Sequence, residues 1–218
     1  MDFKTLADTI YTRQSTRAYL KKPAPNLDFE FVPLIKDIKV RVEMDGNYIS
    51  FYSEHAPMYL ENIGFIGQQI DLALQAQGLG VCWLGVKKPR GGVITMVTGY
   101  PKKDSPRKYP DGFKRKTAQE ITINSEPDDL IEAVRIAPSA INLQPWLVEK
   151  AGNKYNFYLR NPKNPIEKMI SNMRRIDMGI ALAHLYIKAR ALGHTPTITF
   201  DGADHEQGKF IARVELKK

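Results

Sequence analysis

The chain has 218 residues, of which 43% are hydrophobic and 26% are charged, so it can bury a substantial core and does not have the composition of a disordered protein. Its formal net charge of +8 admits nucleic acid, a membrane surface or a phosphorylated small molecule as a partner. No apolar run approaches the roughly 20 residues of a membrane-spanning helix, which argues against a membrane protein.

The sequence also bears on the cellular location of the protein and on whether it binds a metal. The first ten residues include Asp2 and Asp8 and lack the basic and then apolar pattern of a secretory signal. The single cysteine, Cys82, excludes an intrachain disulfide, so a reducing, cytoplasmic location is expected. The four histidines show no metal-ligand spacing, and we expect no metal site.

Hydrophobic periodicity and turn residues predict the elements of the first half. In chain order they are a helix at 3–13, strands at 38–44 and 47–54 joined by a turn at Asp45–Gly46, a helix over 63–74 that ends near Gly78–Gly80, a short buried strand or loop at 81–86, and a strand at 91–101.

The second half is predicted in the same way. Ser125 and Asp128 resemble a capping box before a helix that Pro138 ends. Strands follow at 144–150 and 154–160, then the strongest helix at 178–192, closed by Gly193, and strands at 197–200 and 210–216. Trp83 and Trp146 are interpreted as core residues.

The two halves contain similar segments in the same order. The sequence GNYISFY at 46–52 matches GNKYNFY at 152–158 at a spacing of 106 positions, and LALQAQGLG at 72–80 matches LYIKARALG at 185–193 at a spacing of 113. Each half therefore reads as strand, long helix, glycine stop and strand. The shared order favours a duplicated α+β unit over a chance likeness of two amphipathic helices.

One segment is strongly basic. Residues 102–116 contain seven basic and two acidic residues, with Tyr109 and Phe113 as the aromatic residues among them. This composition is typical of a solvated loop and only weakly favours nucleic-acid binding, which usually interleaves more aromatic residues with the basic ones.

Four motifs together resemble the FMN-dependent nitroreductase family. They are RQSTRAY at 13–19, GLGVCWLG at 78–85, VTGYPKK at 97–103 with KRKTAQEI at 114–121, and APSAINLQPW at 137–146. The last, with its Pro-Ser-x-x-Asn-x-Gln-Pro-Trp pattern, is specific, whereas each of the others is common by itself.

The resemblance implies a nitroreductase-like α+β fold, with mixed, mostly antiparallel sheets packed with helices. It also implies an FMN-dependent oxidoreductase that takes hydride from NAD(P)H and reduces a small nitroaromatic or quinone-type acceptor by a ping-pong route. The flavin carries the chemistry, so no catalytic side chain is required. The absence of a Gly-x-Gly-x-x-Gly segment after a strand is consistent with a nucleotide that only visits the flavin.

The residues expected to bind FMN follow from matching these motifs and from the chemistry of the cofactor. Its phosphate requires guanidinium, ammonium and hydroxyl donors, and a cation near the ring stabilises the reduced, anionic form. Arg17 is the candidate for that cation, and the Leu84–Gly85 backbone for a contact to the ring. The full set is Arg13, Ser15, Arg17, Leu84, Gly85, Lys114, Lys116, Pro138, Ser139, Asn142 and Gln144.

In the family, the Arg-x-Ser-x-Arg and Pro-Ser-x-x-Asn segments that contact one flavin come from different subunits. Here they lie in different halves of one chain, so we expect residues 1–125 to supply the basic parts and residues 126–218 the cradle. The chain would then be a monomer that acts as a pseudo-dimer with one FMN site.

Two other functions remain open at the level of sequence. One is a flavin-binding protein without turnover, whose substrate face was lost with the second site. The other is a module that binds nucleic acid or an acidic partner through residues 102–116, although nucleic-acid and membrane partners are not expected. Family relatives also include dehalogenating and flavin-fragmenting enzymes.

Overall fold

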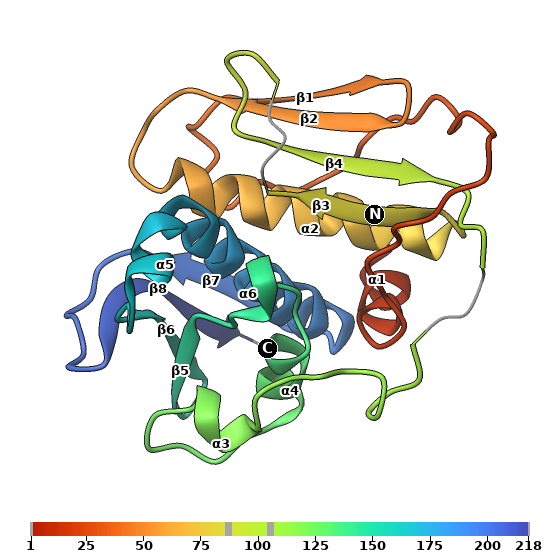
Figure 1. Cartoon of the computed structure of the whole chain (residues 1–218). Coiled ribbons are helices and arrows are strands. Elements are labelled where there is room, and N and C mark those ends of the chain that lie inside the picture. The colour runs from red at the N-terminus through yellow and green to blue at the C-terminus, as the bar shows by residue number, and fades with distance from the viewer. Residues whose placement is uncertain (1, 86–88, 104–106, 218) are drawn as a thin grey trace.

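The computed structural model describes residues 2–85, 89–103 and 107–217 of the chain, so Val86 of one predicted strand and residues 104–106 of the basic segment lie outside the described residues (Figure 1). The first half contains α1 (Phe3–Ile10), β1 (Val40–Asp45), β2 (Tyr48–Ser53), α2 (Tyr59–Ala76), β3 (Gly80–Leu84) and β4 (Ile94–Gly99). Its four strands form one antiparallel sheet in the order β1-β2-β4-β3. The predicted hairpin around Asp45–Gly46 is confirmed.

The second half has a sheet of the same design. α3 (Ala118–Ile121) precedes this half in the chain, and the half contains α4 (Asp129–Arg135), the 3-10 turn η1 (Ala140–Asn142), β5 (Trp146–Ala151), β6 (Lys154–Arg160), α5 (Pro165–Met169), α6 (Ser171–Ala191), β7 (Thr195–Thr199) and β8 (Gly208–Lys217). The strand order is β5-β6-β8-β7, again antiparallel. The long helix of each half connects the second and third strands, so α2 and α6 occupy the same place in the chain order of their halves.

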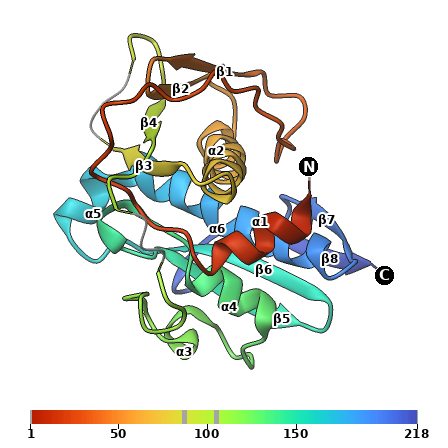
Figure 2. The same ribbon diagram turned by 90° about the vertical axis from the view of Figure 1, so that its right-hand side faces the viewer.

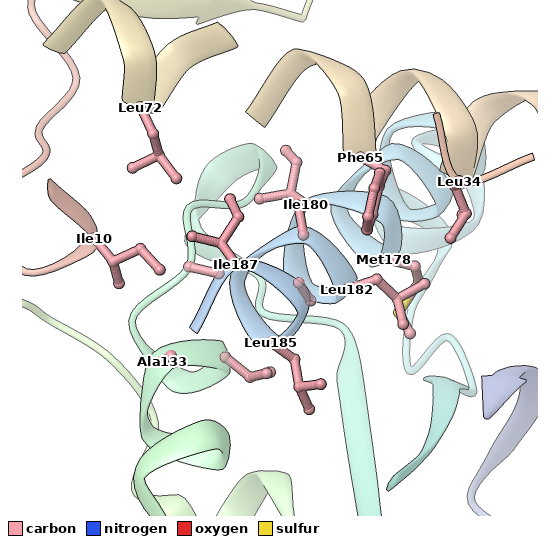
Figure 3. Packing of buried hydrophobic residues seen from close by; sticks show 14 of the residues in the cluster. Ile10, Leu34, Phe65, Leu72, Ala133, Met178, Ile180, Leu182, Leu185 and Ile187 are labelled. Atoms are coloured by element: carbon pink, nitrogen blue, oxygen red, sulfur yellow. The ribbon is translucent and has the colours of Figure 1, made fainter. Parts of the chain in front are cut away.

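The two long helices form the middle of the molecule. α2 packs on the first sheet, α6 packs on the second, and the two helices make the most extensive helix–helix contact of the structure (Figures 1 and 2). Leu72 and Phe65 from α2 and Ile180 and Ile187 from α6 enter the same cluster of buried side chains (Figure 3). The core therefore lies between the halves and includes residues from both.

The helices approach closely because each carries a glycine at the crossing. A methyl group on Gly64 would overlap the carbonyl oxygen of Ile176, and a methyl group on Gly179 would overlap that of Glu61. The two contacts are reciprocal, as in an isologous interface. Arg175 adds a bidentate ion pair across the crossing, with its Nε and Nη2 donating to Glu61 at 2.7 and 2.8 Å.

The crossing corrects the predicted register of the two helices. The glycines 64 and 179 are 115 positions apart, and the same spacing joins Gly78 and Gly193, which end α2 and α6 in the left-handed region at φ +80° and +84°. The predicted spacing of 113 for these segments, which aligned Gly80 with Gly193, was therefore shifted by two residues. The shift arises because Leu79-Gly80 and Leu192-Gly193 are the same dipeptide after an apolar stripe. The glycine that ends α2 is Gly78, two residues before Gly80.

Helix boundaries differ from the prediction at several ends. Asp128 is itself the N-cap of α4 and accepts from the backbone of Leu130 and Ile131, so the predicted Ser125–Asp128 capping box is wrong. The hydroxyl of Ser125 instead donates to the Ile123 carbonyl. A capping box with both reciprocal hydrogen bonds is formed by Thr117 and Glu120 at α3.

Two segments of the first half also extend onto the second half. α1 lies against α6 more extensively than against α2 (Figure 2). Residues 107–123 begin beside the first half, where Arg107 N–H donates to the Thr12 carbonyl at 3.3 Å, and reach the second half, where Ile123 N–H donates to the Val148 carbonyl of β5 at 2.9 Å. These crossings bring the two predicted flavin-binding motifs into the same region.

Replacing Gly179 with alanine tests the helix crossing. Because the added methyl meets backbone on α2, the helices must separate, and we expect unfolding free energy to fall by about 3 kcal/mol or more. The control is Gly152→Ala, whose methyl has open space and whose cost is limited to the left-handed backbone, about 1 kcal/mol. Urea unfolding of the two variants measures both values, and equal losses would contradict the close crossing.

Candidate cofactor site

Two adjoining cavities lie where the halves meet. The first, with a volume of about 370 Å³, is mostly apolar, and the second, of about 410 Å³, is mostly basic. We call them the apolar cavity and the basic cavity. Both are lined by five residues from the two predicted motifs, namely Ser15, Arg17, Pro138, Ser139 and Ile141. Ser15 and Ser139, 124 positions apart in the sequence, thus line one continuous region.

The apolar cavity has walls from β3 and α6. Trp83 presents part of its ring to the cavity and stacks on Phe51, with centroids 6.1 Å apart and an interplanar angle of 11°. Its indole N–H donates to Asp71 at 3.3 Å, which fixes the ring. From α6 come Met173, Ile176, Asp177 and Ile180. Trp146 is fully buried as predicted, whereas Trp83 belongs to the wall of the cavity.

The Arg-Gln-Ser-Thr-Arg segment is held at the edge of the first sheet. Ser15 forms a parallel bridge with Val81 of β3, and Thr16 N–H donates to the Val81 carbonyl at 2.9 Å. The backbone N–H of Gln14 donates to the side chain of Gln75 at 2.8 Å. Backbone hydrogen bonds to β3 and α2 therefore position Ser15 and Arg17 at both cavities, independently of their own side chains.

The basic cavity gathers five cationic side chains, from Arg13, Arg17, Arg107, Lys114 and Arg115. Arg13 is 1% exposed, and its counter-charge among the described residues is Asp71, whose carboxylate lies 3.4 Å from Nε. Its Nη2 and the Nη1 of Arg107 are buried without a hydrogen-bond partner among the described residues. Buried donors of this kind are costly unless an acceptor satisfies them, so the cavity has the donors for an anion.

Burial and the crowding of these cations lower the pKa values of two of them, Arg115 and Arg107. Burial, followed by repulsion from Arg107 and Arg13, lowers the pKa of Arg115 to about 10. The pKa of Arg107 is also lowered, by burial and then by Arg13 and Arg17. An anion in the basic cavity would relieve this repulsion and stabilise the folded protein.

The Pro-Ser-x-x-Asn-x-Gln segment, residues 138–144, forms the cradle that closes both cavities. Ile141, Asn142 and Gln144 have positive φ angles of 48°, 58° and 52°. Left-handed backbone costs non-glycine residues about 1–2 kcal/mol each and is unusual for a β-branched residue such as isoleucine. Such a conformation persists only where its surroundings enforce it.

Residues at the end of the basic segment hold the left-handed backbone of the cradle in place. Arg115 donates to the Asn142 side chain at 2.8 Å and to the Ala137 carbonyl at 3.0 Å, while the Asn142 amide donates to the Lys114 carbonyl at 2.9 Å. Within the cradle, Gln144 N–H donates to the Ser139 hydroxyl at 2.9 Å. Asn142 therefore lines the basic cavity with its amide already engaged, whereas the Ser139 hydroxyl hydrogen remains available.

Three predicted binding residues do not line either cavity in the part of the chain that the structure describes. Lys116 Nζ donates to the carbonyls of Leu143 and Gln144 at 2.9 and 3.0 Å, so its charge holds the cradle backbone and does not face an anion. Gln144 is 4% exposed and accepts from Lys116 N–H at 2.7 Å. Leu84 ends β3, and its neighbour Gly85 lines the apolar cavity in its place.

The structure adds residues that the sequence interpretation missed: Arg107 and Arg115 in the basic cavity, and Trp83 and Asp177 in the apolar cavity. Both arginines belong to the basic segment, whose charge was the available signal. Asp177 lies between Ile176 and Met178 in a long helix, and nothing in the local sequence separates it from a solvated helix residue.

Asp177 is an acidic residue in a buried position on the wall of the apolar cavity. It is 3% exposed, and its two oxygens accept from Ala140 N–H at 3.0 and 3.2 Å. Burial raises the pKa of Asp177 from its ordinary value of 3.8 to about 8, against the opposing effects of the Ala140 hydrogen bond and of Arg174. The carboxyl is therefore largely protonated at neutral pH.

The described residues show neither a metal-ligand cluster nor a membrane-spanning helix. No group of three or more metal-ligating side chains occurs there, and the fully buried His184 is occupied with the Ala133 carbonyl at 2.8 Å. No helix in that part of the chain combines the length and the hydropathy needed to cross a membrane.

Lys116→Met and Lys114→Met should separate cradle support from anion binding. Lys116→Met removes two hydrogen bonds from a charged donor and is expected to lower the unfolding free energy by about 2–3 kcal/mol. Lys114→Met removes a cation that lines the basic cavity and should leave stability nearly unchanged while it weakens binding of a phosphate compound. Urea unfolding and phosphate titration measure these effects, and a reversed pattern would contradict the assignment of Lys116.

The pH dependence of stability tests the environment of Asp177. Because its folded-state pKa is raised, the folded chain binds more protons than the unfolded chain between about pH 4 and 8, and the wild type loses stability as pH rises through this window. Asp177→Asn removes that loss. Its Tm relative to wild type should therefore rise from pH 5 to 8 and then level off. Asp201→Asn, at an exposed position, is the control, and a constant difference for Asp177→Asn would contradict the raised pKa.

Comparisons with known proteins identify the family of the chain. The chain matches the family described as "Putative TM nitroreductase" over residues 30–189. A solved structure described as a putative nitroreductase from Thermotoga maritima has a TM-score of 0.73 and 25% sequence identity to the chain, covering 99% of this chain and 95% of that chain. A search of the curated proteins gave no match. Because the family match spans most of its length, the chain belongs to the nitroreductase family, a family of oxidoreductases.

Proposed function

We propose that the protein is an FMN-dependent oxidoreductase that takes hydride from NAD(P)H and passes electrons to a small acceptor of the nitroaromatic or quinone type by a ping-pong route. The observation that carries the proposal is the pair of adjoining cavities, one basic and one apolar, that the two motifs build together. A phosphorylated, flat cofactor requires these two environments side by side.

The basic cavity fits a phosphate group. Arg13 and Arg107 supply buried guanidinium donors without partners among the described residues, Lys114 adds a further cation, and Ser15 adds a hydroxyl at the junction of the cavities. A phosphate dianion would satisfy these donors and offset the repulsion among the cations. Arg115, which holds the cradle, would contribute charge without leaving its own hydrogen bonds.

The apolar cavity fits a flat ring. Trp83, Ile176 and Ile180 supply apolar surface there, and Arg17 lies at the junction with the basic cavity, where it would stabilise negative charge on the ring. Bound FMN would supply the hydride-transfer chemistry. The chain's own groups would bind the phosphate, orient the ring and exclude water from it.

We also propose that residues 1–125 and 126–218 correspond to the two subunits of a family dimer. The shared strand order and the reciprocal glycine contacts support this proposal. The position equivalent to the cradle in the first half is filled: Leu34 is buried in the core, and its N–H donates to Asn62 at 2.8 Å. The chain would therefore bind one FMN and need no second copy to complete the site.

Two observations decide between this function and its alternatives. Purified protein should carry a flavin absorption spectrum, and NADPH or NADH should bleach it anaerobically. Bound FMN that neither nucleotide bleaches would instead favour a flavin-binding protein without turnover. A colourless protein that binds DNA in a salt-dependent manner would favour a nucleic-acid module, although Arg107, Lys114 and Arg115 of the basic segment face the cavity.

Arg17→Ala and Asn142→Ala test the site itself. Each should weaken FMN binding by about 10–100-fold, because each change disturbs a charge-assisted contact or the residue that holds the cradle, with little loss of fold. Arg41→Ala on the exposed face of β1 is the matched control. FMN titration by fluorescence quenching gives affinity and stoichiometry. Unchanged affinity in both variants would contradict the site, and two FMN per chain would contradict the single-site pseudo-dimer.

A further inference from the structure

The two halves place a similar side chain at equivalent positions of their long helices, but with different chemistry. Asp177 on α6 and Asn62 on α2 are separated by 115 positions, the spacing that relates the crossing glycines. Asp177 accepts from Ala140 N–H at 3.0 Å, and Asn62 accepts from Leu34 N–H at 2.8 Å and Ile35 N–H at 3.1 Å. Ala140 and Leu34 are themselves 106 positions apart, the spacing of the matched strands.

The comparison with Asn62 separates two properties of Asp177: it accepts a backbone hydrogen bond, and it carries an ionisable carboxyl group. Holding a backbone N–H before the first strand of a sheet requires an acceptor, and the amide of Asn62 provides it without charge in the filled half. A carboxyl is therefore not required for this bond. A buried carboxyl also costs folding free energy that a neutral amide avoids.

The two residues differ in what they face. Asp177 lines the apolar cavity, together with Met173 and Ile176 of its own helix. Asn62 is fully buried, and both of its hydrogen-bond acceptances are from the segment that fills its half. The ionisable group is thus present where the cavity is open and has a neutral counterpart where it is filled.

We propose that Asp177 is the proton donor of this site, delivering a proton from its carboxyl to the acceptor while the acceptor is reduced. The inference rests on the proposed function, and it adds a catalytic side chain to a site in which the cofactor was expected to carry all of the chemistry. In a quinone-type acceptor, hydride brings two electrons and one proton to one oxygen or carbon, and Asp177 brings the second proton to the remaining oxygen. The carboxylate left behind takes up a proton from water.

The groups around Asp177 are compatible with this role. Its carboxyl accepts one backbone N–H from the cradle, so one oxygen can keep that bond while the other carries the proton. Arg174 is the charged neighbour on α6, and it is engaged with the Arg160 carbonyl. Across the apolar cavity lie Arg17 and the thiol of Cys82. Burial keeps the acid protonated near pH 7, which is the form required of a donor.

Asp177→Asn is the decisive variant, because it places at position 177 the same neutral amide side chain that the protein has at position 62. We expect FMN affinity and the rate of flavin bleaching by NADPH to stay within about twofold of wild type. Steady-state reduction of a benzoquinone should fall about 100-fold or more in kcat with little change in KM. Reduction of ferricyanide, which accepts electrons without a proton, should not change.

The pH profile and an infrared measurement complete the test. In wild type, kcat with benzoquinone should fall as pH rises past about 8, since the donor is then ionised, and this limb should be absent in Asp177→Asn. Independently of turnover, the infrared carbonyl band of a protonated carboxylic acid should titrate in the flavin-free wild type and be missing from the variant. Asn62→Asp is the matched control and should leave the ratio of benzoquinone to ferricyanide rates unchanged.

Each outcome bears on the proposal. An unchanged ratio of benzoquinone to ferricyanide rates in Asp177→Asn would overturn it, as would an unchanged alkaline limb. Bound FMN that NADPH does not bleach in wild type would contradict the proposed function, and the infrared titration would still decide whether Asp177 holds the proton. Loss of FMN from Asp177→Asn, but not from Asn62→Asp, would show a purely positioning role and would also overturn the proposal.

Discussion

The crossing of α2 and α6 through Gly64 and Gly179 is the contact on which the rest of the structure depends. Because neither helix has a side chain at its closest point, backbone approaches backbone, and the sheets are carried on opposite sides of one continuous core. The buried Glu61 and its partner Arg175 add a directional bond to this apolar contact. The N-terminal part of α6 is thereby placed opposite β3, and the apolar cavity lies between them.

The site is stabilised through the same arrangement, because segments of one half hold the backbone of the other. The left-handed residues of the cradle belong to the second half, but the groups that fix them, Arg115 and Lys116, belong to the segment that arrives from the first sheet. The same backbone segment, residues 138–142, therefore lines both cavities. Ile141, whose neighbour Asn142 is held by Arg115, lines both of them.

Much of the fold and part of the site could be predicted from the sequence because they depend on local patterns. Strand alternation, the turn at Asp45–Gly46 and the amphipathic helices have short periods, and the motif residues Ser15, Arg17 and Ser139 line the cavities as expected. That Lys116 donates to the carbonyls of the cradle could not be predicted, because charge alone does not show which way a side chain points. Asp177 could not be found because its properties come from burial by residues of other elements, and burial is a property of the fold.

The difference between the halves is more informative than their similarity. In each half, a residue of the long helix accepts a backbone N–H from the segment before the first strand. In the first half the donor is the buried Leu34, and the accepting residue, Asn62, is neutral. In the second half Ala140 and Asp177 line the apolar cavity, the backbone is strained at Ile141, and the accepting residue is the acid Asp177. Strain and a buried acid both lower stability, and both occur in the half that keeps its cavity. Because the neutral Asn62 accepts the same kind of bond in the first half, the bond to Ala140 does not require an acid at position 177, and the cost of burying Asp177 is best explained by the cavity that it lines.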